Sequence, residues 1–299
     1  MDKYLDKIIG ENSLLNRNMI ITKADSGFTN TVYILDNKYV IKICTNKNNK
    51  ERFNKEIKFY SDNKNNKYIP KLYSYYISED DYSYEIIEKV EGVTLYNVWH
   101  TFSHEKRNKI LKEIVNMMKS IHQNKGKSYN FALYIKNKLN SDITNIYNIF
   151  NHKELNIFSK IINNLDKYFN TNDFRLIHGD LHFDNILIDQ NNNIKVIDFE
   201  TSLYAPIDYE LDIFLRMCNN PFKYATLEEE KYINKEDYKN IPKYLKENYP
   251  EIFEFKYFEI RHSIYDLEAN LRLLSRFKED TELKNVVINI MYQLDILIK

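Results

Sequence analysis

The sequence predicts an α+β fold with two lobes, in which a small antiparallel sheet with one helix occupies residues 1–90 and a larger, mostly helical region follows at 91–299. Three observations support this prediction. The chain has 299 residues, which is more than one hydrophobic core usually serves. Its first ninety residues contain short segments with strand patterns, whereas later segments show helical periodicity. Gly92 follows the last of these predicted strands and provides a natural hinge between the two regions.

The first region contains strand patterns bounded by turn residues. Five strands are predicted, at residues 19–25, 31–35, 39–44, 72–78 and 82–90. Alternating, β-branched or aromatic residues form these patterns, and turns such as SGFTN, DNK and DD separate neighbouring strands. Between the third and fourth strands, residues 51–63 place Phe53, Ile57 and Tyr60 on one face of a predicted helix. This order predicts an antiparallel sheet with one inserted helix.

The second region is dominated by helical periodicity. Residues 103–123 open with Ser103 as an N-cap and repeat Ile110, Ile114 and Met117 on one face. Further helices are predicted near residues 135–150, 153–168 and 258–277. Two short strands, ILID and IKVIDFE, interrupt the helices.

The composition indicates a folded protein without a general affinity for anions. Hydrophobic residues make up 43% and charged residues 29% of the sequence, values that suit a packed core and an ordinary polar surface. Lysine plus arginine equals aspartate plus glutamate at 43 each, so we expect neither nucleic acid nor a membrane as a partner. No apolar run approaches the ~20 residues that span a bilayer. Only two cysteines, and a start MDKYLDKII that lacks a signal pattern, predict a cytoplasmic location.

The segment HGDLHFDNILIDQNNNIKVIDFE, residues 178–200, carries the strongest chemical pattern. Asn185 follows Asp180 by five residues, and Asp198 follows Asp180 by eighteen. A hairpin between the two short strands would return Asp198 to the loop that holds Asp180 and Asn185. Two carboxylates and an amide oxygen would then converge, and oxygen ligands of this kind are what Mg²⁺ prefers. A plain hairpin with polar turn residues would explain Asn191–Asn193 but not HGDLHFDN.

The same segment resembles the motifs of the aminoglycoside phosphotransferase and choline kinase-like family, whose members are small-molecule kinases with the protein kinase fold. HGDLHFDNIL followed by VIDFE carries the resemblance, with His178-Gly179-Asp180 in place of the HRD triplet and Asp198-Phe199-Glu200 in place of DFG. The layout extends it over most of the chain, but the specific motifs lie between residues 178 and 212. The resemblance implies a bilobal, protein kinase-like fold.

The resemblance also implies a role for each polar residue of the motif. Asp180 is the expected catalytic base, and Asn185 and Asp198 are the expected Mg²⁺ ligands. His178 is expected to hold the loop by hydrogen bonds, and Asp212 to support it structurally.

The first region is expected to bind the nucleotide, either ATP or GTP. Lys42 lies in YVIKIC, the third predicted strand, at the position of the kinase lysine that contacts the phosphates. Glu56, fourteen residues later in the predicted helix, is its expected partner. Considered alone, Lys42 would more simply be a strand lysine that faces water. The backbone at Glu88 and Val90 is expected to hydrogen-bond the purine.

The turn between the first two strands lies where kinases cover the phosphates. Ser26, Gly27 and Thr29 occupy this turn and are candidate ligands of the β- or γ-phosphate oxygens. The turn has one glycine rather than a G-x-G-x-x-G set, so an ordinary hairpin turn is the alternative.

The phosphate acceptor is expected to be a small molecule. Only about a dozen residues separate Asp198 from the helix of Asp212, too few for the peptide-docking activation segment of protein kinases. Glu259, Asp266 and Glu268 are candidate acidic residues for a cationic acceptor.

Several acceptors, and one function without catalysis, fit these observations. An aminoglycoside-like hydroxylated amine ranks first, and choline, another amino alcohol or a sugar is the alternative. Twenty-five tyrosines and Trp99 offer material for an aromatic cage around a quaternary ammonium. A nucleotide-binding pseudoenzyme is an alternative of another class, which the presence of Asp180, Asn185, Asp198 and Lys42 opposes.

Overall fold

The computed structural model describes residues 3–24, 30–224 and 230–298, which form two compact units. Unit 1 comprises Met1–Ile121, His178–Leu203 and Ala225–Asp237, and unit 2 comprises His122–Ile177, Tyr204–Tyr224 and Tyr238–Lys299. The motif segment therefore packs with the N-terminal sheet, although more than eighty residues separate them in sequence. That residues 1–90 bind nucleotide, and residues 91–299 carry catalysis and acceptor binding, stays a prediction.

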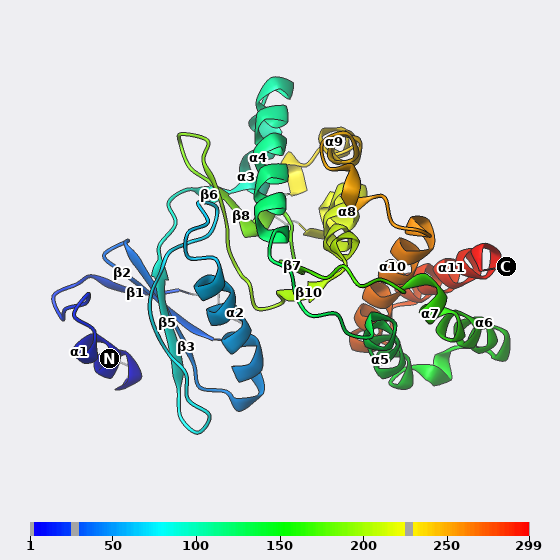
Figure 1. The fold of residues 1–299 in the computed structure, drawn as a ribbon, viewed down its shortest axis with the longest axis horizontal. Coiled ribbons are helices and arrows are strands. Elements are labelled where there is room, and N and C mark those ends of the chain that lie inside the picture. The colour runs from blue at the N-terminus through cyan, green and yellow to red at the C-terminus, as the bar shows by residue number, and fades with distance from the viewer. Residues whose placement is uncertain (1–2, 25–29, 225–229, 299) are drawn as a thin grey trace. The chain divides into compact units, whose positions relative to one another are not determined.

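Unit 1 contains the predicted antiparallel sheet, with strand order β1-β2-β3-β5-β4 (Figure 1). The strands are β1 (Ile21–Lys23), β2 (Thr31–Leu35), β3 (Tyr39–Cys44), β4 (Leu72–Tyr76) and β5 (Ser83–Glu88). β2 and β3 have the predicted bounds, whereas the other strands are shorter than predicted. The antiparallel N-terminal sheet of the predicted fold class is confirmed.

The two faces of the sheet pack against different helices. On one face, α1 (Lys3–Glu11) buries Leu5 and Ile8 in a cluster that includes Ile41 of β3. On the other face, α2 (Lys50–Asp62) buries Phe53 beside Cys44. Because side chains alternate along a strand, Lys42 shares the face of Cys44 and points toward α2.

The helix α1 corrects the prediction of a single helix in this region. Its sequence KYLDKIIGE precedes the first strand and lies within residues 1–90, for which only one inserted helix is predicted. The buried residues Leu5, Ile8 and Ile9 have the spacing of one helical face, and contact with the sheet stabilises a helix too short to be stable alone.

A second, three-stranded sheet holds the motif segment in unit 1. Its strands are β6 (Val93–Thr94), β8 (Ile186–Ile188) and β9 (Ile194–Val196), in the order β6-β8-β9. Gly92 begins this arrangement with a φ of 125°, and a Cβ there would lie against the carbonyl of Ile188. The residue expected to be a hinge is therefore a glycine because β6 approaches β8 so closely.

Two further helices complete the described part of unit 1, α3 (Leu95–Val98) and α4 (His104–His122). α4 confirms the prediction over 103–123, and the Ser103 hydroxyl accepts a hydrogen bond from the Lys106 N–H. Trp99, which follows α3, is 1% exposed and donates its indole N–H to the Asp237 carbonyl. This residue is therefore part of the core and offers no open wall for an aromatic cage.

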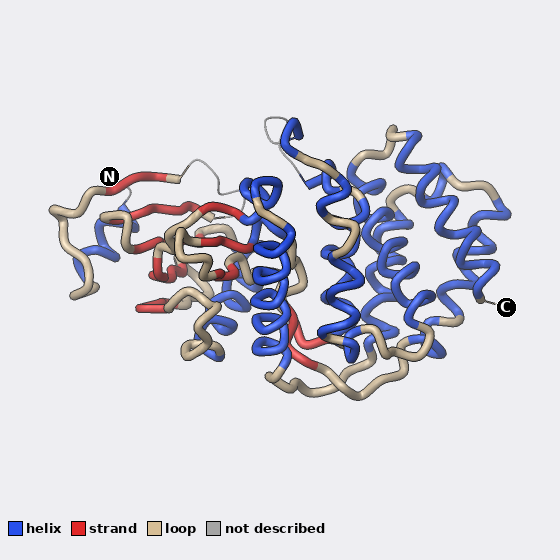
Figure 2. The backbone as a smooth tube through the Cα atoms, turned by 90° about the horizontal axis from the view of Figure 1, so that it is seen from above, coloured by secondary structure: helices blue, strands red, loops and turns tan. Residues whose placement is uncertain are grey.

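Unit 2 consists mainly of helices (Figure 2). They are α5 (Phe131–Thr144), α6 (His152–Asn163), α7 (Leu165–Tyr168), α8 (Leu211–Asn219), α9 (Ile241–Asn248), α10 (Phe258–Arg276) and α11 (Thr281–Leu297). The strands β7 (Arg175–Ile177) and β10 (Leu203–Ala205) pair with each other. α5 begins before the predicted residue 135 because Asn130 caps its N-terminus by accepting the Leu133 N–H.

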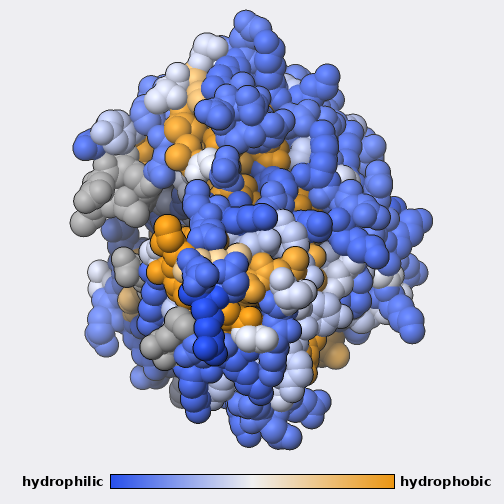
Figure 3. Space-filling view, turned by 90° about the vertical axis from the view of Figure 1, so that its left-hand side faces the viewer, coloured by the Kyte–Doolittle hydropathy of each residue, from blue (hydrophilic) through white to orange (hydrophobic). Residues whose placement is uncertain are grey.

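The face shown in Figure 3 is mostly hydrophilic, with separate apolar areas. Figure 3 views the end of the molecule that carries α1 and β1 and shows orange apolar groups within a largely blue surface. In unit 1, Ile20 is exposed, as are Tyr75 and Tyr76 at the end of the edge strand β4 and Ile77 directly after it. Within the described ranges, no helix is both long enough and apolar enough to span a bilayer.

Candidate active site

Lys42 and Glu56 form a buried ion pair in unit 1. Lys42 projects from β3 and Glu56 from α2, and the Lys42 Nζ lies 2.6 Å from the Glu56 Oε1. The side chain of Lys42 is 17% exposed and that of Glu56 is fully buried. The Lys42 ammonium thus lies at the edge of the buried region, where the buried Glu56 carboxylate holds it in place and stabilises its charge.

The electrostatics of this pair involve other acids. Burial opposes the charged form of Lys42, but the carboxylates of Glu56, Glu85 and Asp198 outweigh burial and raise its pKa. Burial raises the pKa of Glu56, while Lys42 acts in the opposite direction. Since the charge of Asp198 influences both partners, the turn that follows β9 lies near the ion pair.

The loop of Asp180 and Asn185 is tied to the strand end before Asp198. The His178 ring contacts the Ile197 carbonyl through Nε2 at 2.9 Å and accepts the Asp180 N–H through Nδ1 at 3.2 Å. The Asn185 Nδ2 donates to the Asp180 carbonyl at 2.8 Å, and the Ile197 N–H donates to the Asn185 carbonyl at 3.0 Å. These bonds place the predicted base, the predicted amide ligand and the residue before Asp198 in one network.

Asp198 occupies a turn that is anchored to α2. Its φ of 68° is unusual for a residue with a side chain and has to be maintained by surrounding contacts. The next residue, Phe199, is fully buried and stacks on Phe59 with the ring centroids 3.8 Å apart. Phe199 also meets Tyr60 edge to face. The helix that carries Glu56 therefore also fixes the turn of Asp198.

The residues present fit a hard divalent cation. Both hydrogen bonds of the Asn185 carboxamide use Nδ2, and within the described chain its Oδ1 makes none. The Asp198 carboxylate is only partly buried. A free amide oxygen and an accessible carboxylate are suitable Mg²⁺ ligands, with phosphate oxygens and water completing the coordination. Among the described residues, no group of three or more His, Cys, Asp or Glu could hold a metal ion.

His182 lies beside the predicted base. Its Nε2 is 3.8 Å from the Asp180 Oδ2 and 3.3 Å from the Asn185 Nδ2. A protonated His182 would therefore form an ion pair with the carboxylate that is expected to receive the substrate proton.

Two polar contacts of this site escaped the sequence analysis. The Asn30 side chain donates to the Glu200 Oε1 at 2.8 Å, which ties the start of β2 to the residue after Phe199. Glu85 lies on β5 directly opposite Lys42 on β3 and is 0% exposed. A charged residue within the apolar run YEII was a visible signal for Glu85, but its pairing with Lys42 depends on the strand register.

Of the remaining residues predicted to contact the nucleotide, only Glu88 and Val90 lie in the described part of the chain. Ser26, Gly27 and Thr29 lie outside the described residues. Glu88 and Val90 line a pocket of about 520 Å³ together with residues of the β2–β3 and β8–β9 turns. The Glu88 carboxylate forms an ion pair with Lys195 across this pocket, so the segment after β5 is tied to the β8–β9 hairpin.

The candidate acceptor residues lie on α10 in unit 2 and do not form one surface. Glu259 is exposed in the first turn, whereas Glu268 is 1% exposed. With 3.6 residues per turn, Glu259 and Asp266 share a face of the helix and Glu268 projects from nearly the opposite face. The structure therefore separates Glu268 from the other two.

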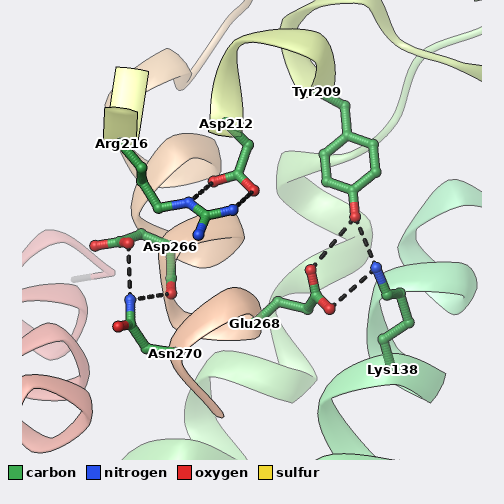
Figure 4. Close-up of polar contacts among 7 residues, drawn as sticks. All are labelled: Lys138, Tyr209, Asp212, Arg216, Asp266, Glu268 and Asn270. Atoms are coloured by element: carbon green, nitrogen blue, oxygen red, sulfur yellow. Dashed lines mark hydrogen bonds and ion pairs between the residues drawn. The ribbon is translucent and has the colours of Figure 1, made fainter. Parts of the chain in front are cut away.

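Figure 4 shows how these acids are paired in unit 2. Glu268 forms an ion pair with Lys138 at 3.0 Å, and Tyr209 contacts both side chains. Asp266 accepts a hydrogen bond from the Asn270 side chain at 2.8 Å, and burial raises its pKa. Of the three candidates, Glu268 is the one neutralised by a lysine inside the core.

Asp212 and its neighbour Asp208 have arginine partners. The Asp212 carboxylate makes a two-pronged contact with Arg216 one turn later on α8 (Figure 4). Asp208 is fully buried and accepts two hydrogen bonds of 2.6 Å from Arg261 of α10. Both carboxylates therefore have structural partners within unit 2.

Comparison with known proteins relates the chain to phosphotransferases. Residues 20–231 match the family model described as "Phosphotransferase enzyme family". A search of curated proteins by sequence found no match. The ADP-bound aminoglycoside phosphotransferase APH(2'')-Ib is 18% identical with a TM-score of 0.65, and the match covers 99% of this chain and 97% of that chain.

Two other solved structures give similar matches. The streptomycin-ATP-APH(2'')-IIa ternary complex is 17% identical with a TM-score of 0.66, covering 98% of this chain and 96% of that chain. A ternary complex of APH(4)-Ia with ADP and hygromycin B is 13% identical with a TM-score of 0.63, covering 99% of this chain and 97% of that chain. The fold predicted from the motifs is thereby confirmed.

Proposed function

Because the chain belongs to the phosphotransferase enzyme family, we propose that it transfers the γ-phosphate of ATP or GTP to a hydroxyl group of a small, cationic, aminoglycoside-like molecule. The observation that carries the proposal is the grouping of the reacting residues in one compact unit. Lys42 pairs with Glu56, and hydrogen bonds join the Asp180 loop to the strand end before Asp198. Phosphoryl transfer depends mainly on positioning and charge stabilisation, which such an arrangement supplies.

Each residue has a defined task in the proposed reaction. Lys42, held by Glu56, binds phosphate oxygens of the nucleotide. Asn185 and Asp198 would hold Mg²⁺, which supplies positive charge to the phosphates when it is bound. Asp180 accepts the hydrogen bond, and then the proton, of the acceptor hydroxyl as the oxygen attacks phosphorus. His178 keeps the loop of this base in place through its two ring contacts.

The proposed acceptor is an aminoglycoside-like molecule that carries both amino and hydroxyl groups. Titles of the similar structures name streptomycin, gentamicin and hygromycin B as molecules bound by those proteins. In unit 2 of this chain, Glu259 is exposed and Asp266 lies on the same face of α10. Acidic side chains of this kind suit protonated amines. The buried Trp99 gives no support to an aromatic cage for choline, so a choline or sugar kinase ranks second.

A nucleotide-consumption screen tests this proposal. We would supply ATP or GTP with Mg²⁺ and offer aminoglycosides, choline, ethanolamine, homoserine and simple sugars one at a time, with the Asp180→Ala protein as the blank. Turnover with aminoglycosides above the blank is expected. Turnover with choline or a sugar alone would show that the proposed acceptor is wrong and that the proposed phosphoryl transfer is right. Nucleotide binding without turnover of any acceptor would favour the pseudoenzyme. The proposal places this activity in the cytoplasm, where ATP and GTP are available.

A further inference from the structure

One lysine of unit 1 stands between two buried glutamates. Lys42 of β3 lies opposite Glu85 of β5 in the sheet, and α2 brings Glu56 to the same ammonium group. The Lys42 Nζ is 2.6 Å from the Glu56 Oε1 but 3.9 Å from the Glu85 Oε1. Only the first distance is that of a hydrogen bond.

The side chain of Glu85 lacks the partners that a buried carboxylate needs. Glu85 is 0% exposed, and neither of its oxygens makes a hydrogen bond within the described chain. One positive charge cannot balance two carboxylates that are both 0% exposed, and a buried, unpaired charge is strongly disfavoured. A proton on Glu85 removes the excess charge. Burial first, and then the charge of Glu56, raise the pKa of Glu85 well above its usual range.

The charged and titratable groups around Glu85 agree with this assignment. The charged groups that influence its pKa are Glu56, Lys42, Glu200 and Asp198. Tyr75 lies opposite Glu85 on β4, and the buried Tyr60 of α2 also interacts with it, since the charge of Glu85 raises the pKa of Tyr60. Three of the four charged groups are acids, so the field favours the protonated form of Glu85. The direct hydrogen bond from Lys42 to Glu56 favours the charged form of Glu56, and Glu85 has no such bond.

We propose that Glu85 is a positioning residue for Lys42, which leaves the lysine free for nucleotide phosphates when it holds a proton and competes for the lysine when it is ionised. This inference rests on the proposed role of Lys42 as a phosphate ligand. Lys42 has three N–H donors, and Glu56 accepts one of them. A neutral Glu85 leaves the others to the phosphates. An ionised Glu85 attracts the ammonium and repels the phosphates.

Nucleotide binding is then coupled to one proton. In the range where Glu85 is ionised in the free protein, binding takes up one proton from solvent and converts the carboxylate to the carboxylic acid. Because the pKa of Glu85 is raised, affinity is full below this pKa and falls as the pH rises through it. Each further pH unit is expected to lower affinity about tenfold until the ionised form itself binds.

Calorimetric titration of a non-hydrolysable ATP analogue with Mg²⁺ tests the coupling. Each titration is run across neutral and alkaline pH in two buffers of different ionisation enthalpy, which gives the number of protons taken up. The proteins compared are wild type, Glu85→Gln as the neutral isostere and Glu51→Gln as a control on the exposed side of α2. Wild type and Glu51→Gln are expected to take up a proton and lose affinity at alkaline pH. Glu85→Gln is expected to bind without this uptake and with a flatter pH profile.

Different results would overturn this inference and the proposed function. Parallel pH profiles and equal proton uptake in wild type and Glu85→Gln would overturn the role of Glu85 alone. Nucleotide affinity that is unchanged in Lys42→Met would overturn the phosphate role of Lys42 and with it the proposed function. If Glu85→Gln does not fold, Glu85→Met provides a second neutral variant. The wild-type titration by itself still decides the matter, because absence of proton uptake at every pH contradicts the proposal.

Discussion

Two hydrogen bonds hold the backbone of Asp180 in its loop. The His178 ring accepts its N–H, and the Asn185 carboxamide donates to its carbonyl. Neither of these two bonds uses the Asp180 carboxylate, so both can form in Asp180→Ala.

Asp180→Ala is therefore expected to abolish most phosphoryl transfer and to leave nucleotide affinity nearly unchanged. General base catalysis contributes roughly 10²–10⁴-fold in rate, and a loss of this size is expected in the steady-state turnover number. Calorimetry would measure nucleotide affinity in the same protein. Asp166→Ala, at an exposed site on α7, is the control. Turnover near the wild-type value in Asp180→Ala would remove this residue from the role of base.

Asp198 combines a charge with an unusual backbone conformation, and two substitutions separate these properties. Asn tolerates a positive φ better than Ala does, so Asp198→Asn removes the charge with little backbone strain. We expect both Asp198→Asn and Asp198→Ala to weaken Mg²⁺-nucleotide binding, and only Asp198→Ala to lower the melting temperature clearly. Calorimetry and thermal unfolding measure the two effects. Full Mg²⁺-nucleotide affinity in Asp198→Asn would count against the ligand role.

At the scale of elements, α2 connects the two halves of the proposed nucleotide site. It holds Glu56 against Lys42 and packs Phe59 on the Phe199 ring next to Asp198. The position of one helix therefore sets both Lys42 and the turn that carries Asp198, the proposed metal ligand.

Phe59→Ala is expected to disturb stability and catalysis together. Loss of a buried phenyl ring costs about 3–5 kcal/mol in the free energy of unfolding, which denaturant titration would measure. The remaining folded protein is expected to show weaker Mg²⁺-nucleotide binding, because the turn of Asp198 loses its anchor. Phe59→Leu keeps much of the volume and should show smaller changes in both. A destabilised Phe59→Ala protein with normal nucleotide affinity would separate the helix from the function of the turn.

In unit 2, the pairing of Arg261 with Asp208 connects α10 to the segment before α8. The side chains are 2% and 0% exposed, so neither charge can turn to water. Arg261→Met leaves the buried Asp208 carboxylate without its positive partner, with the Tyr265 hydroxyl as a remaining donor, and is expected to lower the free energy of unfolding by about 3–5 kcal/mol. The double variant Arg261→Met with Asp208→Leu should recover part of the loss. Urea titration of the three proteins measures this, and equal losses in the single and double variants would contradict it.

For the whole molecule, local patterns were predicted better than pairings between distant segments. The proximity of Asp180, Asn185 and Asp198 could be predicted from their spacing, because the tight hairpin β8–β9 brings Asp198 back to the loop that holds Asp180 and Asn185. The position of Glu85 beside Lys42 was missed because it depends on which residues of β3 and β5 face each other. The face of Glu268 could have been worked out from helical periodicity, but its lysine partner comes from another helix.

Sequence patterns also could not predict which segments of the chain make up each of the two units. The segment His178–Leu203 belongs to unit 1 together with the N-terminal sheet, although its strands β8 and β9 pair in a separate sheet with β6. This grouping arises from packing and not from chain order. The acceptor is equally hard to read, because one fold serves many chemistries. At 17% to 18% identity to two of the similar structures, this chain shares their fold. Its acceptor has to be identified by the nucleotide-consumption screen.

Because Gly92 has a φ of 125°, residue 92 should not accept an amino acid with a side chain, and a selection experiment can test this. In a library with all twenty amino acids at residue 92, only glycine is expected to survive selection for folded protein, because any Cβ would meet the Ile188 carbonyl. Gly10, in the helix α1 with open space around it, is the natural comparison: alanine there should be enriched, with a gain of about 0.5–1 kcal/mol in stability.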